Sequence, residues 1–344
     1  MKLAFVGDIS LGEYYLSFGH GPKSYAHKRN IFENVKDVLS DADFVFGNLE
    51  TPVSNIGLDG KNPESAVLRG DPNHLSMLAD AGFKALSIAN NHIVQHGEDV
   101  FRDTIKELEK NKIVPMGVSG RDTPIFEKNG IKVAIIVASD VPDNTDKNQS
   151  SYDVLDSEKI KNQIRNVKDK VNWVILFLHW GKEDCVLPNP HQMNLIDAFK
   201  LEGANFIIGH HPHIFYPIEA SEKFLSAPSL GNFVFDLCWD ERLMKSGVLH
   251  LELNASAFTA AFTPISLDRN GVPSISGSTK CLGEGVFDPY SNSPDFSRIG
   301  FQKNIFFIKN IFRGEFFLKI KFIFGKILNK IFKIKIYESY KNKD

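Results

Sequence analysis

The sequence contains few cysteines and lacks any long apolar run. Its three cysteines, Cys185, Cys238 and Cys281, are far apart and show no CxxC spacing, so neither a disulfide framework nor a zinc site built on thiolates is expected. The apolar run within the first ten residues, MKLAFVGDIS, is too short for a signal peptide or a membrane span. These absences favour a reducing compartment and give no indication of export.

A strong net charge is also absent, yet the charge is unevenly distributed. Residues 301–344 hold eleven Lys or Arg and three Asp or Glu, a local charge of +8, and because the whole chain has −2, residues 1–300 carry −10. The join, DPYSNSPDFSRIG at 288–300, has the Ser, Pro and Asp content of an exposed linker. We predict a domain over 1–287, a linker over 288–300 and a basic tail over 301–344. The domain is acidic and carries no recognisable nucleic-acid-binding module, so no nucleic-acid partner is expected.

Apolar runs of strand length alternate with amphipathic segments of helix length through the first 220 residues. This alternation is typical of a layered α/β fold. Strands are expected at 2–6, 43–46, 84–88, 133–139, 173–178 and 205–208, and helices at 31–40, 72–82, 98–111 and 191–203. From about 223 the pattern changes to strands without helices between them, at 224–228, 232–236, 247–253 and 260–267, which predicts a second, antiparallel sheet.

Polar side chains follow five of the expected strands. The strand ends carry, in order, Asp8, then Asn48 and Glu50, then Asn91 and His92, then His179 and Glu183, and finally the stretch GHHPH at 209–213. In an open α/β sheet the carboxyl ends of the strands share one edge, where ligand sites form. We therefore expect these side chains to converge although the sequence separates them by two hundred residues.

Converging imidazole, carboxylate and carboxamide groups form a ligand set suited to Zn, Mn or Fe. Two such ions would acidify a bridging water and stabilise a developing oxyanion, which is hydrolase chemistry, and Asp8 and Glu50 would supply the negative charge. Each residue also has a structural interpretation. Asp8 and Asn91 suit helix N-cap positions, and His179 suits an interior histidine bonded to a carbonyl group. The coincidence at five strand ends favours the metal site.

Six strings occur in a fixed order: GDISLGE, GNLETP, ANNHIVQHG, HWGKED, GHHPH and SLGNFVFD. Together they resemble the motifs of the CapA family, the bacterial capsule or poly-γ-glutamate synthesis proteins, over about residues 1–285. That family is a divergent branch of the calcineurin-like metallophosphoesterases. The resemblance implies a layered α-β-β-α sandwich of the metallophosphoesterase type, with mixed sheets.

The family pattern also implies one or two divalent ions, Mn, Fe or Zn, within a defined set of side chains. His92 is implied in proton transfer. The implied metal ligands are Asp8, Glu50, Asn91, His179, His211 and His213, and the implied substrate-facing or supporting residues are Asn48, Trp180, Glu183, His210 and Asn232. Some of these assignments have alternatives, because a tryptophan after a strand also suits the core and Glu183 also suits a solvated position.

Three positions depart from the family pattern. Ser10 stands where the broader superfamily has a histidine two residues after the first aspartate, which predicts a weaker second ion or a single one. Glu13 stands where family members usually carry arginine, and it would repel an anionic substrate there. Gln95 replaces an aspartate and weakens any proton relay through His92. Whether Asn48 or Glu50 bridges two ions is open, with Glu50 favoured because it can be charged.

Two further segments bear on function. The polar loop at 51–72 either covers the site or is an irregular excursion. In the tail, apolar residues recur at steps of three or four between 305 and 334, with Lys and Arg among them. This pattern predicts a basic amphipathic helix that binds an anionic membrane surface through 304–336; docking on its own domain or on a partner is the alternative. The expected location is cytoplasmic, peripheral on the inner face of the cell membrane.

Two functions fit these observations. The first is a metal-dependent hydrolase or transferase that cleaves a phosphoester or amide bond of an envelope polymer or its lipid-linked precursor, in capsule, polysaccharide or poly-γ-glutamate synthesis. The second is a non-catalytic accessory protein that binds the polymer or organises a synthase complex. The resemblance indicates the pathway more directly than the reaction.

Overall fold

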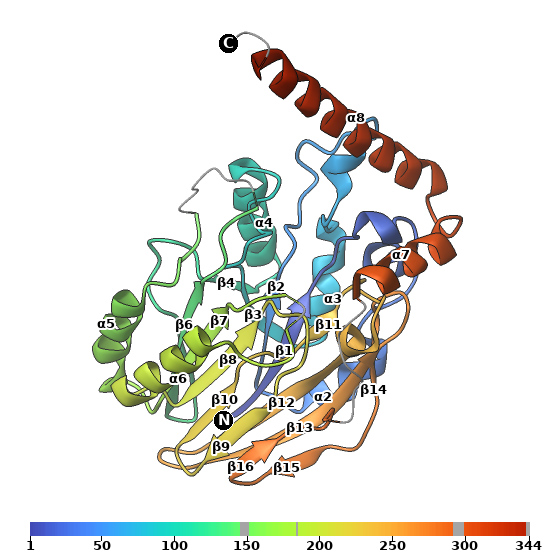
Figure 1. Ribbon diagram of the computed structural model, residues 1–344. Helices are drawn as coiled ribbons and strands as arrows, with labels where there is room; N and C mark the ends of the chain where they lie inside the picture. Colours follow the sequence, from blue (N-terminus) through green and yellow to red (C-terminus); the bar gives the residue numbers. More distant parts are fainter. Residues whose placement is uncertain (145–150, 184, 292–298, 342–344) are drawn as a thin grey trace.

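The chain forms two stacked β-sheets with helices on their outer sides (Figure 1). The computed structural model describes residues 1–144, 151–183, 185–291 and 299–341, with side chains of the C-terminal segment described over 301–328. Phe5 of the first sheet and Phe177 of the second meet between the layers, with ring centroids 5.9 Å apart. Both residues are fully buried, so the main core lies between the two sheets.

The first sheet has nine strands and places the N-terminal strand near its middle. Strands β1 to β4 run parallel, whereas β12 and β13 are antiparallel to their neighbours. In spatial order the strands are β14 (Pro273–Ile275), β13 (Phe258–Leu267), β12 (Lys245–Leu253), β1 (Lys2–Ile9), β2 (Phe44–Leu49), β3 (Phe83–Ser87) and β4 (Val114–Met116), with β11 (Asn232–Val234) also paired to β1 and β15 (Lys280–Leu282) to β13.

The second sheet has seven strands, and its central four are parallel. Its order is β16 (Gly285–Phe287), β9 (Ile218–Ser221), β10 (Phe224–Ala227), β8 (Phe206–His210), β7 (Trp173–His179), β6 (Ile131–Ser139) and β5 (Ile125–Lys128). Central strands such as β7 are buried along their whole length. This explains why their sequences are continuous apolar runs rather than alternating ones.

Helices complete the outer layers. Helices α5 (Ser157–Lys168) and α6 (Pro190–Glu202) pack on the second sheet through a separate apolar cluster, while α2 (Lys36–Ser40), α3 (Leu75–Asp80) and α4 (Glu98–Lys110) belong to the first. Short elements α1 (Pro22–Ala26), η1 (Tyr15–Ser17), η2 (Glu33–Val35), η3 (Pro63–Ala66), η4 (Pro72–His74) and η5 (Glu241–Met244) lie in the loops. The predicted layered α/β fold with mixed sheets is confirmed.

The expectation of a separate antiparallel sheet after residue 223 is wrong. Strand β10 joins the second sheet beside β8, and β11, β12 and β13 extend the first sheet from β1. The local pattern identified these strands but could not identify their partners, because Leu249 and Leu251 are equally suited to any buried surface. Pairing with β1 is a contact between residues about 250 positions apart, such as Lys2 with Glu252.

The C-terminal segment contains two helices, α7 (Ile299–Asn310) and α8 (Phe316–Lys341), where a single helix was expected. Gly314 lies between them with φ +70°, a left-handed conformation that interrupts a helix and favours glycine. The backbone N–H of Glu315 donates to the carbonyl oxygen of Phe18 at 2.9 Å, which ties the turn to the domain. The linker predicted at 288–300 falls partly on 292–298, outside the described residues.

One side of these helices docks on the domain. Phe306 of α7 and Phe322 of α8 are each 8% exposed, and the Phe322 ring stacks on Tyr15 at 4.6 Å. The buried Lys319 ammonium donates to the carbonyl oxygens of Asn310 and Arg313 at 2.8 and 2.7 Å, which links the two helices.

The other side of the two helices exposes apolar residues. They recur at helical spacing, and among them Phe312 and Phe317 are 81% and 84% exposed. Phe301, Ile308, Ile320, Phe324, Ile327 and Leu328 complete this exposed set. We call these eight residues the exposed apolar stripe. Among the described residues, no helix combines the length and the apolar character that a bilayer span requires.

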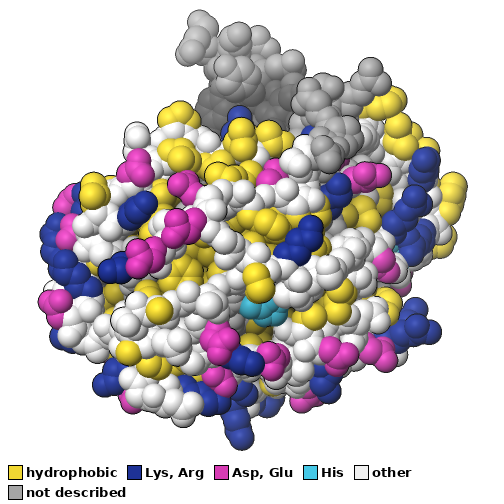
Figure 2. Space-filling view, turned by 90° about the horizontal axis from the view of Figure 1, so that it is seen from below, with side chains coloured by type: hydrophobic (Ala, Val, Ile, Leu, Met, Phe, Trp, Pro, Cys, Tyr) yellow, Lys and Arg dark blue, Asp and Glu magenta, His cyan; other side chains and the backbone are white. Residues whose placement is uncertain are grey.

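The face seen from below carries no field of one charge (Figure 2). Basic and acidic side chains are interspersed there with apolar ones, and a histidine lies exposed near the centre of the view. A continuous basic surface, as nucleic-acid binding requires, is therefore not found on this face.

Candidate metal centre

Five strand ends from both sheets bring their polar side chains into one buried cluster. The predicted ligands are all at most 5% exposed, which few charged or imidazole side chains are unless they have partners. They lie at or just after the carboxyl ends of β1, β2, β3, β7 and β8, and comprise Asp8, Glu50, Asn91, His179, His211 and His213. The convergence expected at one edge therefore involves two sheets rather than one.

Ligand atoms in this cluster approach closely enough to share cations. Three sets of three residues each have one candidate atom per residue, all within 4.8 Å of one another. The sets are Asp8, Glu50 and His213; Glu50, His179 and His211; and Glu183, His211 and His213. Glu50 belongs to the first two sets and so lies between two groups of imidazoles, the position that a bridging carboxylate would take.

Glu50 shows most clearly that the cluster suits a cation. Its carboxylate is fully buried, and neither oxygen has a hydrogen-bond partner. Its Oε1 lies 3.5 Å from Nε2 of His213 and 3.9 Å from Nε2 of His179. A buried carboxylate without partners is costly, and a divalent ion between Glu50 and these imidazoles would remove that cost. The residues present therefore fit a divalent metal.

Asp8 is held in place by several donors. Its Oδ1 accepts a hydrogen bond from Nδ2 of Asn48 at 2.8 Å, and its Oδ2 accepts one from the backbone N–H of His211 at 3.1 Å. Nδ1 of His213 lies 3.4 Å from Oδ2. The carboxylate at the end of β1 is thereby oriented toward the loop after β8. A helix N-cap would not need this orientation, so it favours the metal-site interpretation of Asp8.

The histidine loop after β8 adopts an uncommon backbone conformation. His211 and His213 have φ values of 94° and 61°, although neither is glycine. Such strain persists where the surroundings impose it, and it is frequent at functional sites. Nδ1 of His213 lies 2.9 Å from Oδ1 of Asn232, which can only accept, so this nitrogen carries the proton and Nε2 faces Glu50. Asn232, predicted near the site, thus orients His213.

Carboxamides orient His179. Its Nδ1 lies 3.2 Å from Nδ2 of Asn48, and its Nε2 lies 2.9 Å from Oδ1 of Asn91. Oδ1 of Asn48 is in turn 3.3 Å from Nδ2 of Asn90. Asn48 is therefore engaged through hydrogen bonds on both ends of its amide, which leaves Glu50 as the better placed bridging group.

His92 lies at the edge of the cluster and is partly exposed. Its Nδ1 is 2.8 Å from Oε1 of Gln95, so the residue that replaces the family aspartate still contacts the imidazole, but as a neutral acceptor. Asn144 lies 3.0 Å from the same nitrogen and also contacts Asn91. Sequence reasoning missed Asn90 and Asn144; Asn90 stood in the quoted ANNH motif, whereas no local signal pointed to Asn144.

The electrostatics of the cluster are those of a site built for positive charge. Burial raises the pKa of Glu50 well above its usual value, and repulsion from Asp8 and Glu183 adds to this. Burial would lower the pKa of His213, but Glu50 and Asp8 outweigh it and raise the pKa to about 10. Burial would also raise the pKa of Asp8, yet its interactions with the nearby imidazoles of His210 and His213 hold it well below its usual value.

His179 and His211 remain neutral. Burial, followed by repulsion from His211, lowers the pKa of His179 well below its ordinary value. Burial and repulsion from His213 lower the pKa of His211 to about 4. Neutral imidazole is the form that binds a metal, so these two side chains need not lose a proton to do so.

The remaining predicted residues occupy different places. His210 stacks on Phe177 and lies 3.5 Å from Oδ1 of Asp8, while both its ring nitrogens lack hydrogen bonds. Glu183 is exposed, yet shares a potential ligand set with His211 and His213.

Trp180 does not face the cluster. It is fully buried in the core of the second sheet, where its indole N–H donates to the carbonyl of Pro228 at 3.0 Å. This burial favours the core alternative for Trp180 over the implied substrate role.

Glu13 has a different role from the one expected. Its carboxylate accepts hydrogen bonds from the backbone N–H groups of Gly19, Gly21 and Ser24 at 2.8 to 3.0 Å and is 5% exposed. It therefore holds the loop around α1 together and does not repel a substrate. Ser10, at the superfamily's histidine position, is buried and its hydroxyl has no partner.

The 51–72 loop is ordered by Arg69. The guanidinium is 1% exposed and donates to the carbonyl oxygens of Ser54, Ile56 and Ser65. The loop also contacts the segment around His92, because Nε2 of His96 lies 2.8 Å from the carbonyl oxygen of Val67. It is thus an organised element beside the cluster rather than an irregular excursion.

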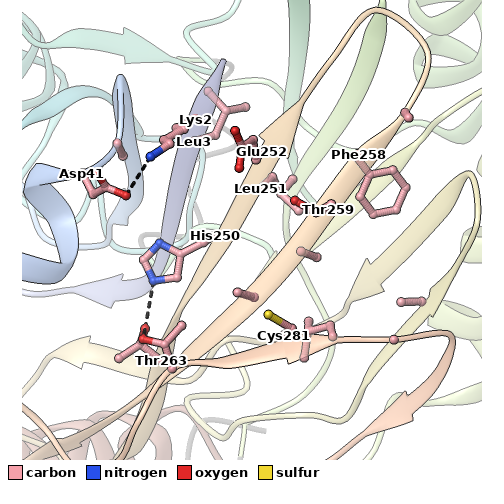
Figure 3. A pocket seen from close by; sticks show the side chains of 18 of the residues that line it. Lys2, Leu3, Asp41, His250, Leu251, Glu252, Phe258, Thr259, Thr263 and Cys281 are labelled. Atoms are coloured by element: carbon pink, nitrogen blue, oxygen red, sulfur yellow. Dashed lines mark hydrogen bonds and ion pairs between the residues drawn. The ribbon is translucent and has the colours of Figure 1, made fainter.

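A cavity of about 750 Å³ lies away from the cluster (Figure 3). It opens at the edge of the first sheet, where Lys2 pairs with Asp41 and Nε2 of His250 contacts Oγ1 of Thr263 at 2.9 Å. None of the predicted site residues lines it. Its size alone does not make it the reactive site, because it lacks the converging buried ligands described above.

Comparison with known families and proteins gives matches over most of the domain. Residues 2–237 match the model of the family "Bacterial capsule synthesis protein PGA_cap". The chain is 31% identical over 280 residues to the "PGA biosynthesis protein CapA" of Bacillus subtilis (strain 168), covering 78% of this chain and 72% of that protein. It is 30% identical over 278 residues to the "Capsule biosynthesis protein CapA" of Bacillus anthracis, covering 75% and 65%. The matched part of the chain contains all the predicted ligands.

Solved structures give weaker matches. One is a putative 5'-nucleotidase from Staphylococcus aureus, with a TM-score of 0.47 and 13% identity, covering 89% of this chain and 58% of that one. Another is a 5'-nucleotidase from Candida albicans, with a TM-score of 0.44 and 13% identity, covering 78% and 53%.

Proposed function

The chain belongs to the bacterial capsule synthesis protein family PGA_cap, and from this membership we propose that it is a metal-dependent hydrolase or transferase in the synthesis of a cell-envelope polymer. The proposed reaction breaks a phosphoester or amide bond in the polymer or in its lipid-linked precursor. The observation that carries this proposal is the buried Glu50 carboxylate, which has no hydrogen-bond partner and lies among histidines from two sheets.

The residues that would hold one or two divalent ions divide into two groups around Glu50. Asp8 and His213 form one side, and His179 and His211 form the other. Asn91 adds a carboxamide oxygen beside His179. A bound divalent ion, Mn, Fe or Zn, would supply an acidified water and stabilise negative charge that develops on the substrate.

The chain's own groups prepare the reaction around that centre. Asn232 and Asn48 fix the orientations of His213 and His179 through their carboxamides. His92 is partly exposed at the edge of the cluster, where an imidazole can give a proton to a leaving group or take one from a nucleophile. Burial lowers its pKa, partly offset by the hydrogen bond with Gln95, so His92 is neutral near pH 7 and suits a general base.

We further propose that the two C-terminal helices bind an anionic membrane surface. The exposed apolar stripe would enter the acyl boundary, and the basic residues of 301–344 would contact lipid headgroups. This would hold the domain next to a lipid-linked precursor on the inner face of the membrane. The docked side of the helices supports the arrangement, because Phe306 and Phe322 pack the two helices against the domain. The part of the proposed 304–336 segment beyond 328 has side chains outside the described residues.

Metal analysis combined with turnover tests the enzyme proposal. Protein loaded with Mn²⁺, Fe²⁺ or Zn²⁺ is assayed for bound metal and for hydrolysis of a panel of phosphoesters and γ-glutamyl amides. We expect His211→Ala to lose metal, and His92→Ala to keep metal but lose roughly 10²- to 10⁴-fold in turnover. The control is His191→Ala, an exposed histidine outside the cluster. Stoichiometric metal without hydrolysis of any panel member would favour a polymer-binding accessory role.

Vesicle flotation tests the membrane proposal separately. Full-length protein and a form lacking residues 301–344 are mixed with vesicles of anionic or neutral lipid. We expect only the full chain to float, and only with anionic vesicles. Equal flotation of both forms would contradict a tail anchor while leaving the metal centre untouched.

A further inference from the structure

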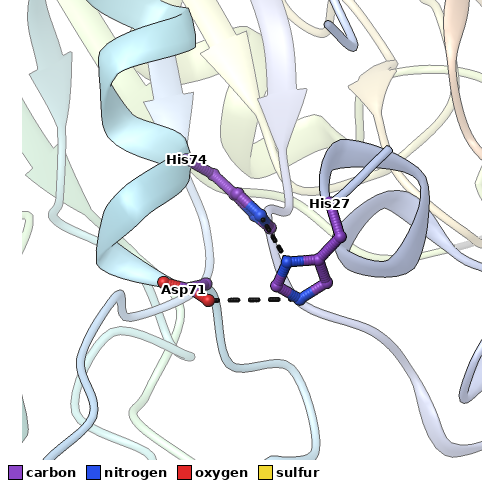
Figure 4. Close-up of side chains that lie close together, drawn as sticks. All are labelled: His27, Asp71 and His74. Carbon is purple, nitrogen blue, oxygen red and sulfur yellow. Dashed lines mark hydrogen bonds and ion pairs between the residues drawn. The ribbon is translucent and has the colours of Figure 1, made fainter. Parts of the chain in front are cut away.

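A second group of metal-ligating side chains lies outside the candidate centre. His27, Asp71 and His74 each offer one donor atom within 4.8 Å of the others, and they share no residue with the three sets around Glu50. Figure 4 shows the two imidazoles and the carboxylate turned toward one another from separate segments. His27 follows α1, Asp71 precedes η4, and His74 ends η4.

The two imidazoles have the separation expected of neighbouring ligands on one ion. Nδ1 of His27 lies 3.2 Å from Nε2 of His74, and the ring planes are 68° apart. Zinc–nitrogen bonds of about 2.0 to 2.1 Å at a tetrahedral angle place two nitrogens about 3.3 Å apart. The same distance also suits a hydrogen bond between neutral imidazoles, so the distance alone does not decide between the two.

The third ligand and the accessibility of the site favour an ion. Oδ1 of Asp71 accepts a hydrogen bond from the backbone N–H of Asn73 at 2.9 Å, which fixes the carboxylate at the start of η4. Its Oδ2 lies 4.0 Å from Nε2 of His27, and one donor atom from each of the three residues lies within 4.8 Å of the other two. The side chain of His27 is 51% exposed, so an ion can enter and water can complete its coordination. His74 is 3% exposed and provides a fixed ligand at the inner end.

We propose that His27, Asp71 and His74 bind a borderline divalent cation of the zinc, cobalt or nickel class that ties the α1 loop to the start of α3. Two imidazoles and one carboxylate form a donor set that such ions prefer over Mg²⁺ or Ca²⁺. The two segments already lie side by side, since Nδ1 of His27 lies 3.2 Å from Nε2 of His74. The ion would cross-link them at their outer ends, independently of any catalysis at Glu50.

One nearby charge opposes the ion and supplies a sharp test. The Lys23 ammonium interacts electrostatically with both Asp71 and His74. Its removal leaves the three ligands in place and lowers the positive charge around them. Lys23→Gln is therefore expected to tighten cation binding roughly threefold or more, whereas a simple His27–His74 hydrogen bond would show no metal affinity to tighten.

The experiment measures Co²⁺ and Zn²⁺ binding to the full chain by equilibrium dialysis, with the visible absorption of Co²⁺ as a second readout. His211→Ala weakens the candidate centre, and because the two compared proteins both carry this change, the difference between them reports the second site. We expect His211→Ala protein to retain one equivalent, and the double variant His27→Gln/His211→Ala to lose it or to bind at least tenfold more weakly. His191→Gln is the matched control, because His191 is also exposed and paired with an aspartate, Asp140, at 3.4 Å.

Two results would overturn the proposal. One is equal Co²⁺ stoichiometry and affinity in His211→Ala and the double variant. The other is no bound cation in His211→Ala protein even at millimolar Co²⁺, which would leave a hydrogen-bonded trio only. A circular-dichroism melt of each variant shows that it is folded, and His27→Asp, which keeps a ligand at this position, is expected to restore part of the binding. Failure here would not affect the proposed function, because the two sites share no residue.

Discussion

The candidate metal centre and the C-terminal helices depart in opposite ways from the usual distribution of polar and apolar groups. In the centre, charged and imidazole side chains are buried, and both oxygens of Glu50 lack hydrogen bonds. On the C-terminal segment, Phe312 in the turn between the helices and Phe317 of α8 are more than four-fifths exposed. Each arrangement is costly for the isolated chain. The difference indicates two kinds of missing partner, a cation for the centre and an apolar surface for the helices.

The largest expected effect is that of a substitution at Glu50, which tests whether the candidate centre lacks a cation. Glu50→Gln removes the carboxylate between the two histidine groups and should weaken metal binding on the order of 10³-fold, since even outer-shell changes cost 10- to 100-fold. The metal-free variant should be more stable than metal-free wild type by roughly 1 to 3 kcal/mol, because a buried charge without partners is gone. Metal titration and thermal melts of both forms measure this.

The exposed Glu222 provides the control for that substitution. Glu222→Gln should change neither metal affinity nor the melting temperature of the metal-free protein. Equal metal affinity in wild type and Glu50→Gln would show that the unpaired carboxylate is not part of a metal site.

Asp236 is a buried carboxyl group outside the cluster, and it shows what burial does to a carboxyl group away from the candidate metal centre. Oδ2 of Asp236 accepts the backbone N–H of Tyr14 at 2.7 Å, but Oδ1 has no partner. Burial, with repulsion from Glu13, raises the pKa of Asp236 to about 7. The folded state thus holds a proton that the unfolded state has lost above pH 4, so stability should fall as the pH rises from about 4 to 7.

Asp236→Asn should remove that pH dependence. The raised pKa corresponds to a loss on the order of 4 kcal/mol at most across this window. Urea denaturation at pH 5 and pH 8 measures it, with the exposed Asp169→Asn as control. A wild-type stability that rises between pH 5 and 7, unchanged in Asp236→Asn, would contradict the assigned cause.

The two sides of α8 are tested by replacing a docked phenylalanine and, in a separate variant, an exposed phenylalanine by alanine. Phe322→Ala should weaken docking of α8 by about 3 kcal/mol, because its buried ring stacks on Tyr15. Phe324→Ala, two positions along and 62% exposed, should leave docking unchanged but reduce binding to anionic vesicles. Hydrogen exchange of α8 and vesicle flotation separate the two effects. Equal loss of docking in both variants would show that α8 does not have two distinct faces.

The smallest expected effect concerns the surface charge that accompanies docking. Nζ of Lys326 lies 3.2 Å from Oε1 of Glu64, with both side chains largely exposed at 60% and 44%. Exposed pairs contribute about 0.5 kcal/mol and are screened by salt. Lys326→Met should therefore barely change hydrogen exchange of α8, as should Lys321→Met. A large, salt-sensitive change in Lys326→Met alone would mean that charge rather than apolar contact holds the helix.

Much of the fold and of the site could be predicted from local sequence signals. Strand runs such as 173–178 and the helix closed by Gly203 are visible because burial on both faces and a left-handed C-terminal residue leave clear patterns. The polar residues after five strands were expected to converge, and the structure brings Asp8, Glu50, His179, His211 and His213 together.

The rest depended on contacts that a local pattern does not encode. The partner of β12 is strand β1, and the same apolar alternation would have suited another sheet. The surroundings of Trp180 and Glu13 could not be predicted for the same reason. Trp180 packs in the core of the second sheet, and the Glu13 carboxylate accepts hydrogen bonds from three backbone N–H groups. His27 and His74 showed no motif, since 46 residues separate them and only the fold places them together.

The position of β1 has a consequence for how the protein is made. This strand is synthesised well before β12, yet it lies in the middle of its sheet, between β2 and β12, and its register pairs Lys2 with Glu252. Contacts of such sequence separation form late and slow folding. About 250 residues must therefore leave the ribosome before β1 can pair with β12 and the surroundings of Asp8 are complete. Until then the edge of β1 is unpaired and accessible to chaperones and to neighbouring nascent chains.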